Sequence, residues 1–131
     1  MDALISKLRE HGIQPSAQRL AVGRCVLETR LHPSADQVWA EVKVELPTVS
    51  RATVYNTLNL FVEHGLLKQL ALSEGRVVFD PNLEPHHHLI DATSGEIHDV
   101  PWEAVDIRGE PEVSGFSVDE FQVVMRGTRK H

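Results

Sequence analysis

Residues 50–80 carry the pattern from which the fold of this chain can be inferred, and they read SRATVYNTLNLFVEHGLLKQLALSEGRVVFD. Ser50 is a favourable N-cap, and apolar residues then recur at helical spacing until Gly65, a residue type that commonly follows a helix C-terminus. Two short runs with strand composition come next, at residues 66–71 and 76–80. The stretch therefore predicts one amphipathic helix followed by a β-hairpin.

Three more helices are expected before this stretch, over residues 2–11, 17–29 and 35–46. Each has apolar residues at helical spacing, and Ser16 and Ser34 can cap the second and the third. A turn at residues 73–75 would join the two strands of the hairpin. A series of helices followed by a hairpin is the order of a winged helix, a helix-turn-helix variant whose hairpin flanks the DNA backbone.

The helix predicted at residues 51–64 carries short polar side chains opposite its apolar stripe. This pattern suits a helix that lies in a DNA major groove, although an ordinary solvated helix face has the same periodicity. The hairpin that follows favours the first interpretation. Candidate groove contacts are Thr53, Tyr55, Asn56 and Thr57, and candidate phosphate contacts are Arg19, Arg51 and Lys68.

Charge is distributed unevenly along the chain. Residues 1–70 hold eight Lys and Arg against seven Asp and Glu, whereas residues 71–131 hold five against twelve. The formal net charge of −6 argues against a protein that binds polyanions over its whole surface. A local basic face on the first half is compatible with the same numbers.

The composition also gives an expectation for the cellular compartment of the protein. No apolar run approaches the roughly 18 residues of a membrane-spanning helix, and the N-terminus lacks the basic and apolar regions of a secretory signal. Cys25 is the single cysteine, which excludes an intrachain disulfide and a cysteine-based zinc site, and we interpret it as a small packing residue. We therefore expect a cytoplasmic protein without a membrane partner.

The second half of the sequence predicts short strands that follow a turn-forming linker. Strands are expected at residues 86–91, 96–100 and 118–126, with one helical turn at residues 101–105. About 45 residues with three short strands make a poor independent core, so we expect a second copy of the chain to complete it.

Together these expectations describe an α+β fold. An N-terminal winged helix-turn-helix domain at residues 1–81 is followed by a small α/β dimerisation domain at residues 82–131, which contains a short antiparallel sheet. The partners expected for such a chain are double-stranded operator DNA and a second copy of itself, in a homodimer.

Histidine is unusually frequent, with eight residues in 131, and three of them are consecutive. On a strand, His86 and His88 would share one face while His87 would point to the other. Imidazoles combined with carboxylates suit Fe(II), Mn(II) or Zn(II). A polar surface strand or a fortuitous run of histidines would give the same sequence pattern. Candidate ligands are His32, Asp80, His86, His88 and Asp99.

Four stretches of the chain, in order, resemble the ferric uptake regulator superfamily of bacterial repressors. They are Arg19 with the helix after it, the run His32-Pro33-Ser34-Ala35-Asp36, the run Ala52-Thr53-Val54-Tyr55-Asn56-Thr57-Leu58, and Asp80 through His88 to Asp99. The resemblance implies a metal-dependent repressor whose regulatory ion is held by five ligands between its DNA-binding and dimerisation halves. The matching positions here are His32, Asp80, His86, His88 and Asp99.

The resemblance also implies an ion and a signal. Fe(II) or Mn(II) is the expected cofactor, and Zn(II) could occupy the site in preparations. An acid of the type found at Asp99 is associated with peroxide-sensing members, whereas Glu is usual in iron-sensing ones. Asp91 and Ser94 stand where the family's structural zinc site has a cysteine pair, so we expect that cysteine-bound zinc to be absent.

Three alternatives stay open on the sequence. The chain is also similar to the iron response regulator branch, whose members respond to haem through a histidine run such as residues 86–88, which makes haem an alternative cofactor. A small non-haem metal enzyme would use the same donors, but the chain offers no obvious base or nucleophile beyond them. A metal buffer or haem carrier would not need the helix-hairpin half.

Overall fold

The computed structural model describes residues 2–29, 31–72 and 75–130. The chain divides into two compact units, Met1–Leu83 and Glu84–His131, so the first unit runs two residues further than expected. Within the described residues, no helix has the length and apolar character needed to cross a membrane.

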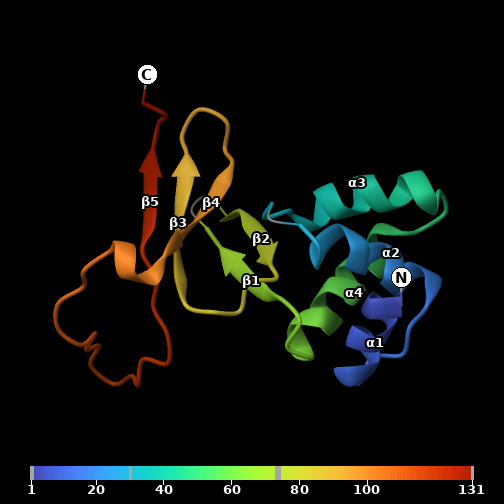
Figure 1. Ribbon diagram of the computed structural model, residues 1–131, viewed down its shortest axis with the longest axis horizontal. Helices are drawn as coiled ribbons and strands as arrows, with labels where there is room; N and C mark the ends of the chain where they lie inside the picture. Colours follow the sequence, from blue (N-terminus) through green and yellow to red (C-terminus); the bar gives the residue numbers. More distant parts are fainter. Residues whose placement is uncertain (1, 30, 73–74, 131) are drawn as a thin grey trace. The chain divides into compact units, whose positions relative to one another are not determined.

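The first unit contains the four helices in the expected order (Figure 1). They are α1 Asp2–Glu10, α2 Ala17–Val26, α3 Ala35–Glu45 and α4 Arg51–Glu63. Ser16, Ser34 and Ser50 cap the last three, each accepting a hydrogen bond from the backbone N–H three residues further on. At Ser34 the side chain of Gln37 accepts the N–H of the cap in return, which completes a capping box and sets the start of α3.

The apolar stripe of α4 supplies the centre of this unit's core. Val54, Leu58 and Phe61 are fully buried, together with Leu8 of α1 and Val38 of α3. The three α4 residues follow the helical repeat, so the opposite side of the helix faces the surface. Removing a large buried aromatic side chain commonly costs about 3–5 kcal/mol, so this stripe is a main source of the unit's stability.

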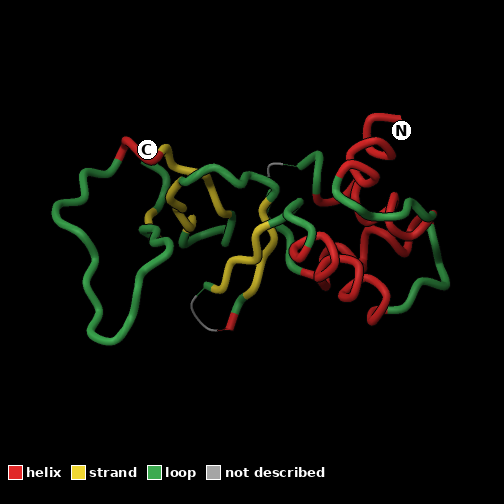
Figure 2. Tube along the Cα trace, turned by 90° about the horizontal axis from the view of Figure 1, so that it is seen from below, coloured by secondary structure: helices red, strands yellow, loops and turns green. Residues whose placement is uncertain are grey.

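The predicted hairpin follows α4 and consists of β1 Lys68–Ala71 and β2 Val77–Asp80, paired antiparallel (Figure 2). The backbone N–H of Phe79 donates to the carbonyl of Pro33 at 2.9 Å, which ties β2 to the segment before α3. Residues 73–74 of the predicted turn lie outside the described residues. The order of four helices and a hairpin confirms the winged-helix prediction.

The second unit is built on a three-stranded sheet with the order β4-β3-β5. β3 His86–Asp91 pairs antiparallel with β4 Ile97–Pro101, but β5 Val124–Gly127 pairs with β3 in parallel. The predicted short antiparallel sheet is therefore present as β3 and β4, and β5 extends it in parallel. β4 ends opposite His86, at the start of β3. The connection from β4 to β5 passes from one edge of β3 to the other at this end, so β5 also begins near the start of β3 and runs in the same direction.

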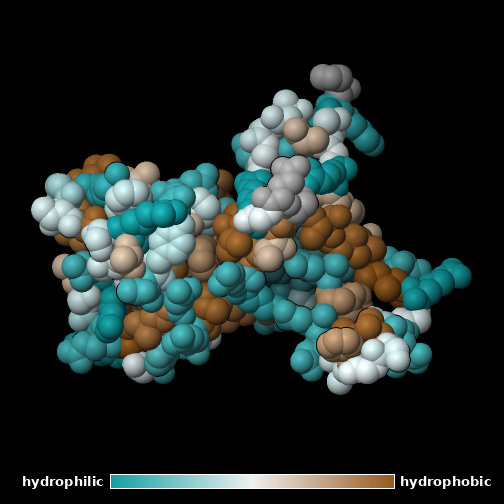
Figure 3. All heavy atoms as spheres, turned by 180° about the vertical axis from the view of Figure 1, so that it is seen from behind, coloured by the Kyte–Doolittle hydropathy of each residue, from teal (hydrophilic) through white to brown (hydrophobic). Residues whose placement is uncertain are grey.

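The connection between β4 and β5 leaves apolar side chains at the surface (Figure 3). After the short 3-10 helix η2 Trp102–Ala104, the strand predicted from residue 118 forms only from Val124, because the preceding residues have no partner strand. Phe116 is 77% exposed, whereas Ile90 and Ile97 are the only buried apolar residues among those described in this unit. The unit therefore has a thin core of its own.

Candidate metal centre and nucleic-acid interface

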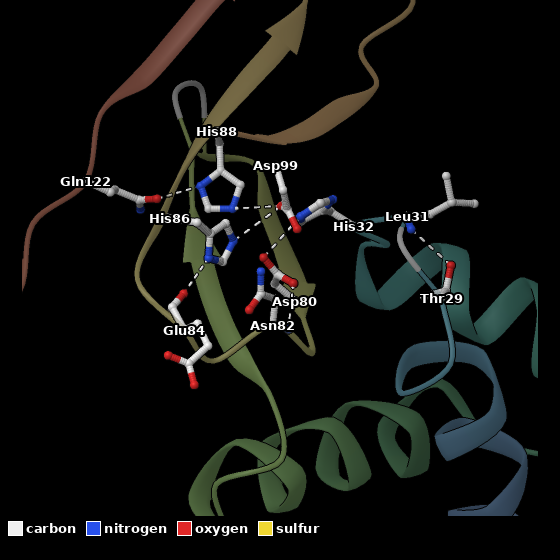
Figure 4. Close-up of polar contacts among 10 residues, drawn as sticks. All are labelled: Thr29, Leu31, His32, Asp80, Asn82, Glu84, His86, His88, Asp99 and Gln122. Carbon is white, nitrogen blue, oxygen red and sulfur yellow. Dashed lines mark hydrogen bonds and ion pairs between the residues drawn. The ribbon is translucent and has the colours of Figure 1, made fainter. Parts of the chain in front are cut away.

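His32 and Asp80 form a buried pair within the first unit (Figure 4). α2 stops at Val26 rather than at residue 29, and the segment that follows is non-helical, with the Leu31 N–H donating to Thr29 Oγ1. His32 comes next, and the backbone bond from β2 holds this segment beside Asp80. His32 Nε2 and Asp80 Oδ2 are 3.1 Å apart, and the two side chains are 2% and 3% exposed. Residues 48 positions apart in the sequence thus become neighbours.

His86, His88 and Asp99 form a second cluster, which lies wholly within the second unit. The antiparallel register places His88 opposite Asp99, and strand alternation puts His86 on the same face as His88. Asp99 Oδ1 lies 3.3 Å from His86 Nε2 and 3.6 Å from His88 Nε2. Both imidazoles are buried, at 8% and 2% side-chain exposure, while the carboxylate is 38% exposed. The sequence prediction for this strand pair is confirmed in its geometry.

The hydrogen bonds of the two imidazoles determine which ring nitrogen carries the proton. His86 Nδ1 lies 2.6 Å from the backbone carbonyl oxygen of Glu84, and His88 Nδ1 lies 2.6 Å from Gln122 Oε1. Both oxygens can only accept, so each Nδ1 is placed to donate, and Nε2, on the side of Asp99, is the nitrogen through which each ring could bind a cation. Gln122 has no counterpart in the sequence prediction, because nothing in a pattern relates it to a residue 34 positions earlier.

His87 lies on the opposite face of β3, as predicted, but that face is covered. Its ring is fully buried and stacks on Trp102 with centroids 4.5 Å apart. The backbone N–H of Val123 donates to His87 Nδ1 at 2.9 Å, so the proton of this ring sits on Nε2. Nδ1 of the middle histidine thus accepts a hydrogen bond, whereas Nδ1 of each outer histidine faces an oxygen acceptor.

The donors in these clusters fit a divalent cation of the kind expected. Imidazole nitrogens and carboxylate oxygens suit Fe(II), Mn(II) and Zn(II), and no thiolate stands among them. His32 with Asp80 is one part of the predicted ligand set, and His86 and His88 with Asp99 are the other. Each part is pre-arranged within its own unit.

The hairpin turn between β3 and β4 is closed by hydrogen bonds to a carboxylate. Asp91 Oδ1 accepts from the N–H groups of Thr93 and Ser94 at 2.9 and 3.3 Å. These backbone donors hold the pKa of Asp91 below its usual range. Asp91 and Ser94, which stand where the resemblance places a cysteine pair, therefore stabilise this turn by hydrogen bonding.

The polar side of α4 holds the predicted groove contacts with one exception. Asn56 is exposed, and Thr53 and Tyr55 are half-buried, with the Thr53 hydroxyl 2.8 Å from that of Ser50. Thr57 differs, since it is 6% exposed and its hydroxyl donates to the Thr53 carbonyl at 2.8 Å. Because the buried face of α4 includes this position, the prediction that Thr57 faces a groove does not fit the structure.

The predicted phosphate contacts already have partners within the unit. Arg51 donates to both carboxylate oxygens of Asp36, at 2.7 and 3.2 Å, and to the Tyr55 hydroxyl at 3.1 Å. This guanidinium lowers the pKa of Asp36. Arg19 donates to the Gln14 carbonyl at 2.8 Å, and Lys68 is half-buried at the start of β1. A phosphate at Arg51 would compete only with an exposed ion pair, and ion pairs of this kind contribute little to stability because solvent screens them.

Cys25 behaves as a packing residue. It is half-buried against the core of the first unit. Burial, followed by the nearby Glu41 carboxylate, raises the pKa of its thiol to about 11. The thiol is therefore protonated near neutral pH and a weak nucleophile, which argues against a redox role.

Comparison with known sequences gives a consistent match. Residues 10–126 match the model of the Ferric uptake regulator family. The peroxide-responsive repressor PerR of Staphylococcus epidermidis is 31% identical over 123 residues, which cover 94% of this chain and 80% of that protein. PerR of Staphylococcus aureus strain Mu50 is 33% identical over 99 residues, which cover 76% and 67%.

Comparison with solved structures agrees at the level of the fold. A zinc-bound manganese uptake regulator matches with a TM-score of 0.72 at 22% identity, covering 97% of this chain and 98% of that one. The peroxide stress regulator of Campylobacter jejuni matches with a TM-score of 0.62 at 23% identity, covering 99% and 96%.

Proposed function

Because this chain belongs to the ferric uptake regulator family, and is thus a metal-responsive transcriptional regulator and not an enzyme, we propose that one Fe(II) or Mn(II) ion controls its binding to operator DNA. The proposed ligands are His32, Asp80, His86, His88 and Asp99. The observation that carries the proposal is Asp99, whose carboxylate lies beside the Nε2 atoms of two buried imidazoles. The haem alternative has no support in the relatives described above.

The ligand set suggests how the ion would act on the protein. His32 and Asp80 belong to the unit that carries the winged helix, and the other three ligands belong to the unit with the sheet. One ion bound by all five would restrict how the two units move against each other. In a dimer this would set the spacing of the two α4 helices on DNA.

Peroxide is the signal that we propose. Asp99 is of the acid type associated with peroxide-sensing members, and the PerR proteins of two Staphylococcus species are relatives of this chain. Zn(II) would also fit the donors and could occupy the site in preparations. As a DNA-binding regulator, the protein would work in the cytoplasm, where bacterial operators are found.

The test of the proposed function combines metal analysis with DNA binding. Protein purified with Fe(II) or Mn(II) should contain about one ion per chain, and a chelator should remove that ion together with sequence-specific DNA retention. Readdition of Mn(II) should restore the retention in a gel-shift assay. DNA retention that ignores the chelator would contradict the proposal.

We also propose that the protein is a homodimer formed mainly by residues 86–131. The thin core of the second unit and the exposure of Phe116, Val113 and Phe121 favour a second copy as the partner. Light scattering at micromolar concentration should therefore give twice the chain mass of 14.7 kDa. A monomer under these conditions would count directly against the prediction.

Substitutions of a proposed base contact and of a proposed phosphate contact should have different effects on DNA binding. The Tyr55→Ala variant should lose discrimination between operator and random DNA, at about 1–3 kcal/mol for a base contact. Arg19→Ala should weaken both kinds of DNA equally and reduce the slope of the salt dependence by about one. Fluorescence anisotropy at several salt concentrations measures both effects. Parallel losses for the two variants on every sequence would refute the assignment.

A further inference from the structure

Gln122 contacts the imidazole of His88, one of the proposed ligands. Its Oε1 lies 2.6 Å from His88 Nδ1, and an amide oxygen accepts hydrogen bonds only, so the ring proton is drawn to Nδ1. The lone pair is then on Nε2, the nitrogen that lies 3.6 Å from Asp99. We infer that Gln122 is a positioning residue that holds His88 in its metal-binding tautomer; this rests on the proposed function, in which His88 is a ligand.

The alternative tautomer would disable the ligand. With the proton on Nε2, His88 would point an N–H at the Asp99 carboxylate, which could accept it. That contact would satisfy the ring, but it would place hydrogen where the cation has to bind. A neutral imidazole can ligate only through its unprotonated nitrogen, so the partner of Nδ1 decides whether Nε2 is available as a donor.

The residues on either side of Gln122 make defined contacts with the unit. Val123 donates its N–H to His87 Nδ1 at 2.9 Å, and its carbonyl accepts the His88 N–H at 3.1 Å. On the other side, the Phe121 ring packs against Trp102 with centroids 5.2 Å apart. The amide therefore reaches His88 from an anchored segment rather than from a loose one, as a positioning residue requires.

His88 differs from the neighbouring ligand in this respect. His86 Nδ1 has its partner in the main chain, the carbonyl of Glu84, which no side-chain substitution removes. His88 relies on a side chain instead, and on one that is exposed at the surface of the unit. Substitution of Gln122 should therefore change the His88 tautomer without opening a cavity in the core.

The test uses two variants of the full chain and a matched control. Gln122→Met keeps the length of the side chain but removes the acceptor, whereas Gln122→Glu keeps an acceptor for Nδ1–H. Gln69→Met makes the same exchange at an exposed position of β1. Nitrogen-15 and carbon-13 chemical shifts of His88 in metal-free protein report its tautomer, and Mn(II) titration followed by electron paramagnetic resonance reports affinity.

The inference predicts a shift of His88 toward the Nε2–H form in Gln122→Met, with Mn(II) affinity about 10–100-fold weaker, as is usual when the outer partner of a ligating histidine is lost. Gln122→Glu should keep the Nδ1–H form and bind Mn(II) within a few-fold of the unmodified protein. Gln69→Met should match the unmodified protein in both measurements.

Two results would overturn parts of this scheme separately. An unchanged His88 tautomer and unchanged Mn(II) affinity in Gln122→Met would overturn the role of Gln122, while the proposed function would stand. Failure of the unmodified protein to bind Mn(II) would overturn the proposed function, and the chemical shifts of the metal-free variants would still show whether Gln122 sets the tautomer.

Discussion

Replacement of His88 by alanine is expected to abolish metal-dependent DNA retention. The loss of a direct ligand should weaken Mn(II) binding by more than the 10–100-fold that removal of an outer partner typically costs, so we expect an effect above about 100-fold. His88 is 2% exposed and its Nε2 lies beside Asp99. His86 is the one other histidine on that face of β3, and it is already a proposed ligand, so no described side chain of the strand can replace His88 as a donor. Mn(II) titration and a gel-shift assay with added Mn(II) measure the two losses.

His98 provides the matched control for this variant. It lies on β4 next to Asp99 but on the opposite face of the strand, and its side chain is 43% exposed beside Glu96. His98→Ala removes an imidazole from the same sheet and should leave both Mn(II) affinity and DNA retention unchanged. If His88→Ala kept metal-dependent retention, or if His98→Ala lost it equally, His88 would have to leave the proposed ligand set.

Peroxide treatment of the Fe(II)-loaded protein is expected to add one oxygen atom to His32 or His86 and to release DNA. Fe(II) held by these ligands would activate peroxide, chemistry that Mn(II) does not readily supply, and the net change would transfer one oxygen atom from peroxide to the imidazole with release of water. Among the proposed ligands the imidazoles are the side chains that can take up oxygen, since the carboxylates resist oxidation, and resemblance to peroxide-sensing members points to these two. Since both rings are largely buried, their modification would report on local chemistry rather than on oxidants in solution.

Peptide mass mapping and DNA binding decide this prediction together. The Mn(II) form, treated identically, should keep both histidines unmodified and should retain DNA. His11, which lies at the end of α1 and contacts the Lys7 carbonyl, serves as an internal control and should stay unmodified in both forms. Unmodified His32 and His86 in an Fe(II) form that nevertheless releases DNA would exclude ligand oxidation as the mechanism.

Local patterns in the sequence were sufficient for most of the first unit. Helical spacing with Ser16, Ser34 and Ser50 as caps predicted α2, α3 and α4 to within a few residues, because capping and amphipathic periodicity act over a single turn. The same reasoning failed for the last strand. β5 is short and parallel to β3 because of where the preceding connection crosses, and no local pattern encodes that path.

In the candidate metal centre, too, some contacts could be predicted from local sequence patterns and others could not. Period-two alternation predicted from the sequence alone that His86 and His88 share a face, since strand geometry fixes the direction of successive side chains. The register of β3 and β4 in the structure then adds Asp99 to that face. Only tertiary structure decided that Thr57 is buried, that His87 is covered by Trp102, and that Gln122 meets His88. Each of these depends on contacts between segments remote in sequence, and such contacts are set by how the whole unit packs rather than by any window of residues.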